Sequence, residues 1–99
     1  MKIAFLVCNE VYSARITEIF AKTRIDYYTS WEQVKGKGHG TQPHLGTRSF
    51  PGMNVVFMIA FEEESPLTDL IQEIKLANEQ IHRPDDRIRL FQVPLEKIV

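Results

Sequence analysis

The chain lacks several features that would fix its class at once. It has one cysteine, Cys8, among 99 residues. An intramolecular disulfide and a zinc finger built on cysteine pairs are therefore excluded, and a reducing, cytoplasmic location is expected. No apolar stretch approaches the ~20 residues of a membrane-spanning helix, so no membrane insertion is expected. The apolar run from Ile3 to Cys8 is shorter than the core of a typical signal peptide, and we interpret it as a buried strand.

An excess of charge of either sign is also missing. The chain carries 12 Lys and Arg residues against 13 Asp and Glu residues, which gives a net charge of -1. Such a balance provides no bulk attraction to nucleic acid or to anionic lipid. Tyr27, Tyr28 and Trp31 have rings that stack well on bases, but no basic cluster surrounds them in the sequence. Nucleic-acid binding is therefore not expected.

What the chain does contain is an alternation of strand and helix patterns. Short apolar or alternating runs predict strands at Lys2–Cys8, Ile25 to about Lys35, Met53–Phe61 and Arg87–Val93. Apolar residues at helical spacing predict helices from about Glu10 to Thr23 and from Ser65 to before Pro84. Asn9 is a suitable cap for the first helix, and Ser65 with Pro66 suits the start of the second.

This order, βαββαβ, predicts an α+β fold of the ferredoxin-like kind in a single domain, residues 1–99. Two right-handed crossovers with a hairpin between them place four antiparallel strands in the order 4-1-3-2, with both helices on one face. The first and third strands are apolar on both of their alternating faces, yet two helices cover only one face of a sheet. We therefore expect the other face to pack on copies of itself in a closed homo-oligomer.

All five glycines lie in the connection between the second and third strands, residues 36–52, which begins GKGHG after Lys35. Ordinary hairpin loops have about two to five residues, and a loop of this length is usually functional or disordered. Glycine amides together with Lys35, Lys37 and Arg48 would suit a phosphate. The alternative, that the glycines give only flexibility and the lysines only solubility, has equal weight. No Walker A or Rossmann glycine motif is present.

The exit of the second strand, V-K-G-K-G, the long loop, the apolar third strand and the ending LFQVPLEKIV together resemble the PII-like signalling proteins, relatives of the PII nitrogen regulators. The resemblance covers essentially the whole chain. It implies a ferredoxin-like homotrimer in which residues 36–52 form a flexible T-loop that contacts a partner protein. It also implies that adenine nucleotides or related small molecules bind in clefts between subunits, at the base of that loop.

By the same resemblance, Gly36, Lys37 and Gly38 match the ligand-facing base of the T-loop, and Arg89 matches a basic phosphate-binding residue. Lys35 is a further candidate for ligand binding because of its positive charge. The sequence departs from the PII pattern in three respects. HRPDDRI replaces the glycine-rich B-loop, Val99 is followed by no arginine-bearing tail, and the loop has no tyrosine to modify. Binding of ATP in the usual PII manner is therefore not implied.

Two loop histidines, His39 and His44, raise an alternative. Imidazole is a good ligand for zinc and copper, and loop histidines from three subunits would be able to meet near an oligomer axis. The spacing H-x-x-x-x-H in a loop does not fix a geometry, so solvated histidines are the default. Cys8 suits a small buried apolar position better than a metal site.

The sequence thus favours a non-enzymatic sensor. No serine, cysteine or carboxylate has surroundings that mark a nucleophile or a general acid. The leading hypothesis is a cytoplasmic homotrimer that binds a small anion, an adenine nucleotide or a related molecule, and that presents residues 36–52 to a partner. The resemblance suggests a membrane transporter as that partner. The alternative is a trimer that binds or responds to a divalent metal through His39 and His44.

Overall fold

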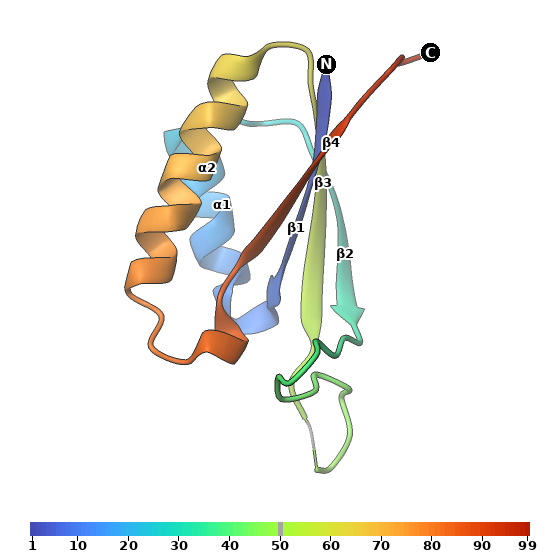
Figure 1. Ribbon diagram of the computed structural model, residues 1–99, viewed down its shortest axis with the longest axis vertical. Helices are drawn as coiled ribbons and strands as arrows, with labels where there is room; N and C mark the ends of the chain where they lie inside the picture. Colours follow the sequence, from blue (N-terminus) through green and yellow to red (C-terminus); the bar gives the residue numbers. More distant parts are fainter. Residues whose placement is uncertain (50) are drawn as a thin grey trace.

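The computed structural model describes residues 1–49 and 51–99. Its four strands and two helices follow the predicted order, with two short 3-10 turns, η1 and η2 (Figure 1). The strands are β1 (Lys2–Asn9), β2 (Thr29–Val34), β3 (Asn54–Phe61) and β4 (Arg89–Pro94). The helices are α1 (Ser13–Lys22) and α2 (Glu64–Glu79), and the turns are η1 (Glu10–Tyr12) and η2 (Pro84–Asp86). No helix of the described residues is long and apolar enough to cross a bilayer.

The sheet has the strand order β2-β3-β1-β4, with every neighbouring pair antiparallel. Both helices pack on one face of it, as Figure 1 shows. The α+β, ferredoxin-like fold and the order 4-1-3-2 predicted from the sequence are thereby confirmed. The chain ends both lie at one end of the sheet, and the β2–β3 connection projects from the opposite end (Figure 1).

The core lies between the sheet and the two helices. Alternate residues of β1 (Ala4, Leu6 and Cys8) are buried there, because side chains along a strand point to opposite faces. Their cross-strand partners in β3 are buried with them, and α1 and α2 contribute a stripe of isoleucine, leucine and phenylalanine. Phe20 and Phe57 meet edge to face across the layers, with ring centroids 5.3 Å apart. These two layers fix the sheet that carries the loop.

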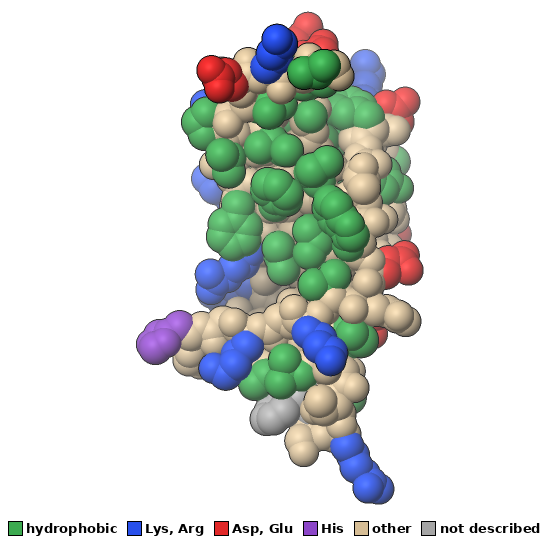
Figure 2. Space-filling view, turned by 90° about the vertical axis from the view of Figure 1, so that its right-hand side faces the viewer, with side chains coloured by type: hydrophobic (Ala, Val, Ile, Leu, Met, Phe, Trp, Pro, Cys, Tyr) green, Lys and Arg blue, Asp and Glu red, His purple; other side chains and the backbone are tan. Residues whose placement is uncertain are grey.

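The other sheet face has no helix over it. The register places Ile3 with Val93, and Phe5 with Met58 and Phe91, on this face. Trp31 joins them from β2, opposite Val56. Figure 2 shows that apolar side chains gather over this face of the sheet. We call this surface the open face.

Several local predictions differ from the structure. Ser65 does not cap α2, because the helix already begins at Glu64 and extended Glu63 precedes it without a side-chain cap. The second strand begins at Thr29 rather than Ile25, and the rings of Tyr27 and Tyr28 pack on phenylalanines before the ladder starts. The fourth strand begins at Arg89 rather than Arg87. Asn9 accepts a hydrogen bond from the Val11 amide, 3.1 Å away, but it caps the 3-10 turn η1 rather than α1, which begins at Ser13 and not at Glu10.

Candidate functional site

The β2–β3 connection is closed at its base by a short backbone bridge. The amide of Gly36 donates to the carbonyl of His44 and the amide of His44 donates to the carbonyl of Gly36, each over 2.7 Å. Further along, the Gly46 amide donates to the Gly52 carbonyl over 3.0 Å. The connection is therefore divided into a base, residues 36–44, and a projecting part, residues 46–49 and 51–52. Phe50 lies outside the described residues.

His44 fixes this base to the sheet. Its Nδ1 lies 2.7 Å from Oδ1 of Asn54, the first residue of β3, which is only 9% exposed. Because an amide oxygen only accepts hydrogen bonds, Nδ1 of His44 carries the proton and donates it. A side chain at Gly36 would clash with the Asn54 amide, so a glycine is needed at this close approach.

The second ring nitrogen of His44 faces the η2 turn. Its Nε2 lies 3.7 Å from Oδ1 of Asp86, and Oδ2 of Asp86 lies 3.8 Å from Nε of Arg83. Both nitrogens of the ring are therefore directed at residues of the chain itself. His39, in contrast, is exposed in the loop. Within residues 1–49 and 51–99, no group of three His, Cys, Asp or Glu side chains is arranged to hold a metal ion.

A second set of contacts joins the loop base to the same turn. The backbone amide of Gln42 donates to Oδ2 of Asp85 over 3.2 Å, and Nη2 of Arg83 donates to the side-chain oxygen of Gln42. Closer to β2, the Gly38 amide donates to the Thr41 hydroxyl over 3.0 Å. The loop base thus rests against η2, although the two are far apart in the sequence.

A cleft of about 340 Å³ lies between the loop base, the end of β1 and the start of β4. Its lining combines cationic side chains, glycine backbone and apolar groups from three segments of the chain. The lining residues that matter here are Val7, Cys8, Gly36, Lys37, Gly38, Asp85, Arg87, Arg89 and Phe91. The positive charges and the loop glycines therefore surround one space, as a site for an anion requires.

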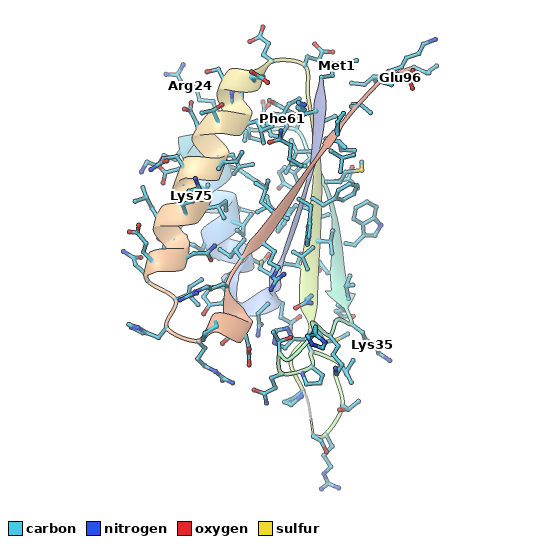
Figure 3. The ribbon with its side chains drawn as sticks, viewed as in Figure 1. Met1, Arg24, Lys35, Phe61, Lys75 and Glu96 are labelled. Carbon is cyan, nitrogen blue, oxygen red and sulfur yellow. The ribbon has the colours of Figure 1, made fainter. Side chains whose placement is uncertain are left out.

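Four of the five predicted ligand-binding residues line this cleft: Gly36, Lys37, Gly38 and Arg89. Lys35 does not line it, and Figure 3 shows its side chain at the end of β2, pointing away from the helices. Of the two predicted metal ligands, only His44 lines the cleft, and it is engaged with Asn54.

The segment that leads into β4, which includes Arg87, is held by a side chain of α2. The amide side chain of Asn78 accepts a hydrogen bond from the Ile88 amide at 2.8 Å and donates one to the Ile88 carbonyl at 2.9 Å. Ile88 itself is buried. Because Ile88 is fixed in this way, Arg87 and Arg89 on either side of it stay at the cleft.

Cys8 is one of the lining residues of the cleft, and its side chain is buried. Burial raises the pKa of its thiol to about 12, since a thiolate would lose its hydration there. The neutral thiol is therefore the form present at physiological pH. The expectation of a small buried apolar residue is confirmed, because the side chain is only 3% exposed.

Sequence reasoning missed Asn54, Asp85, Asp86 and Arg87 as members of the site. A polar Asn54 at the start of an otherwise apolar run, NVVFMIAF, was a signal that its side chain has a specific partner. The segment that contains Asp85 and Asp86 was noted only as a departure from the glycine-rich B-loop. Its contacts with Gln42 and His44 arise from the tertiary fold and have no signature in the sequence.

Comparisons with known proteins identify the fold. No family model matches the chain, and no curated protein matches its sequence. Solved structures match it well, and those described here are distant in sequence. CPII, a nitrogen regulatory PII-like protein from Thiomonas intermedia K12 bound to ADP, AMP and bicarbonate, matches with a TM-score of 0.69 at 14% identity, over 93% of this chain and 84% of that chain.

Two further structures agree. CPII from the same organism, bound to ADP and bicarbonate, matches with a TM-score of 0.68 at 15% identity over 93% and 84% of the two chains. A PII-like signalling protein from Thermus thermophilus matches with a TM-score of 0.59 at 16% identity over 93% and 83%. The chain therefore has the fold of the PII-like proteins, and the resemblance predicted from its sequence is confirmed at the level of the fold.

Proposed function

We propose that this chain is a non-enzymatic, cytoplasmic sensor that binds an adenine nucleotide or a related small anion in the cleft at the loop base. One observation carries this proposal: Gly36, Lys37 and Gly38, from the loop, share a single cleft with Arg87 and Arg89, from the other end of the chain. In the same fold, CPII has been solved with ADP, AMP and bicarbonate.

The chemistry of the cleft suits a nucleotide better than a small inorganic anion. Lys37, Arg87 and Arg89 supply positive charge for phosphate oxygens, and the arginines are able to bind them in a bidentate manner. Phe91 and Val7 add apolar surface, and aromatic rings stack readily on nucleobases. A ligand with a flat apolar part and an anionic part matches both features.

Calorimetric titration with ATP, ADP, AMP and cyclic AMP tests this proposal. We expect at least one of them to bind, and we expect Arg89→Ala and Lys37→Ala each to weaken binding by about tenfold or more, the usual loss for a charge-assisted contact to phosphate. Lys75→Ala is the matched control, because Lys75 is exposed on α2, far from the loop (Figure 3). The absence of heat with every nucleotide would contradict the proposal.

The proposed sensor is a homotrimer, as the resemblance implies. The open face supports self-association, because Trp31 is 47% exposed, Phe91 49% and Val93 44% in the isolated chain. The cleft is open on one side, and a neighbouring subunit would be able to complete it. In the trimer, residues 36–52 would present the projecting part of the loop to a partner protein, and a membrane transporter is the partner that the resemblance suggests.

Multi-angle light scattering tests the assembly. We expect three chains per particle at micromolar concentration for the wild type. Val93→Asp should dissociate it, because it buries a charge in the interface. Leu76→Asp is a matched control, since Leu76 is also 44% exposed but lies on α2, away from the open face. A monomeric wild type, or dissociation by both variants alike, would refute assembly through the open face.

A further inference from the structure

One carboxylate lines the cleft, and its negative charge would repel an anionic ligand. Of the described residues that line the cleft, Asp85 is the only acidic one, and it shares the cleft with Lys37, Arg87 and Arg89. It is half-buried in the η2 turn and accepts a hydrogen bond from the backbone amide of Gln42 over 3.2 Å. A carboxylate thus holds an amide of the loop base, at the rim of a positively charged cleft.

Gln42 is held a second time by the same segment, since Arg83 donates to its side-chain oxygen. Both contacts of Gln42 lie at the surface, where water competes for both partners and keeps the net contribution of a hydrogen bond small. Contacts of this strength are sufficient to bias the position of the loop base, and a ligand is able to break them.

The neighbouring contacts of the base are firmer. His44 is joined to Gly36 by two backbone hydrogen bonds of 2.7 Å, and its ring is bonded to the buried Asn54. The base therefore has a fixed part at Gly36 and His44 and a weakly held part between them. Gln42 is the point at which the weakly held part meets the η2 turn.

We propose that Asp85 is a built-in competitor for the anionic group of the ligand. Without ligand, its carboxylate holds the Gln42 amide and keeps the loop base against η2. An anion in the cleft repels the carboxylate and breaks its hydrogen bond to the Gln42 amide, which releases residues 38–43 from the turn. Asp85 thereby lowers the affinity for anions and couples binding to a change in the loop. This inference rests on the proposed function, because it requires that an anion bind in this cleft.

The test compares Asp85→Asn with the wild type in titrations with ADP, AMP and uncharged adenosine. Removing one like charge from a site near the surface should tighten AMP binding by about tenfold, and ADP binding by more, because ADP carries more charge. Adenosine should bind both proteins equally. Asp26→Asn is the matched control, since it makes the same change of net charge at an exposed position before β2 and should leave all affinities unchanged.

A second measurement follows the loop directly. In Asp85→Ala without ligand, hydrogen exchange of the Gln42 amide should be faster than in the wild type, and saturating ADP should speed that exchange in the wild type. Equal nucleotide affinities for the wild type and Asp85→Asn, or unchanged exchange in Asp85→Ala, would overturn the inference while nucleotide binding itself stands. Failure of the wild type to bind any nucleotide would instead overturn the proposed function, and this inference with it.

Discussion

The close approach of Gly36 to Asn54 gives a quantitative test of how the loop base is fixed to the sheet. In Gly36→Ala, the new methyl group would meet the side-chain amide of Asn54, which is short, buried and held by His44. Overpacking of this kind costs about 1 to 3 kcal/mol. Replacing glycine by alanine also lowers the conformational entropy of the unfolded chain, which stabilises the folded state by about 0.4 to 1 kcal/mol. We therefore expect a net loss of about 1 to 2 kcal/mol in the free energy of unfolding.

The reason for this loss is tested by a double-mutant cycle with Asn54→Ala. That variant leaves the Nδ1–H group of His44 without its acceptor, which costs about 1 to 3 kcal/mol. It also removes the side-chain amide of Asn54, with which the methyl group introduced by Gly36→Ala would clash. In the double variant the clash is absent, so the total loss should be smaller than the sum of the single losses by the cost of the clash, about 1 to 3 kcal/mol.

Urea unfolding at one fixed protein concentration measures each free energy, since an oligomer unfolds in a concentration-dependent manner. Gly40→Ala is the control, because Gly40 has a φ of +72° and a methyl group added there would have no non-neighbouring heavy atom within 4 Å. It should lose about 1 to 2 kcal/mol from backbone strain alone, additively with Asn54→Ala. If Gly36→Ala and Asn54→Ala add to within about 0.5 kcal/mol, the proposed clash is wrong.

Three further predictions concern the surroundings of the cleft. Asn78→Ala should lower the free energy of unfolding by about 2 to 3 kcal/mol in urea melts, because both backbone groups of Ile88 lose a partner. The raised pKa of Cys8 means that only the unfolded chain loses the thiol proton between pH 9 and 12. The contribution of Cys8 to stability should therefore fall by about 1.4 kcal/mol per pH unit in this range, and the difference between the wild-type and Cys8→Ala stability curves should show this fall. Equimolar zinc should leave the melting temperature unchanged, since the described residues form no three-ligand cluster and the ring of His44 is hydrogen-bonded to Asn54. A zinc-dependent rise in the melting temperature that His44→Gln abolishes would instead support the metal hypothesis.

The fold was predictable because its main signals are local. A strand with one face in the core and an apolar residue at each position of its other face gives a continuous apolar run, as in β3, and a helix over a sheet needs a stripe at a spacing of three to four residues. The errors are also local. Ile25 to Tyr28 alternate like a strand, but Arg24 has a φ of +60° and the chain reaches the ladder only at Thr29. Alternation alone does not distinguish extended chain from paired strand.

The site was predictable only in part. The glycines and Lys37 were recognisable by composition, and Arg89 by resemblance, but the division of the loop was not. The interpretation from sequence placed His44 in the part of the loop expected to move, whereas the structure bonds it to Gly36 and Asn54. That arrangement depends on a polar residue at the start of β3 and on the η2 turn, and both reach His44 only through the tertiary fold.

The proposed binding of an anion in the cleft would have a consequence for the loop. The loop base, the η2 turn and the start of β4 all line the cleft, so a bound ligand would be able to contact more than one of them. A ligand shifts a conformational equilibrium only by its difference in affinity for the two states. Here that difference is limited to the contacts of Gln42 with Asp85 and Arg83, about 1 to 3 kcal/mol for two exposed hydrogen bonds, or roughly a 5- to 150-fold shift. Such a shift is enough for a graded switch, and by reciprocity a partner that binds the released loop would tighten ligand binding by the same factor.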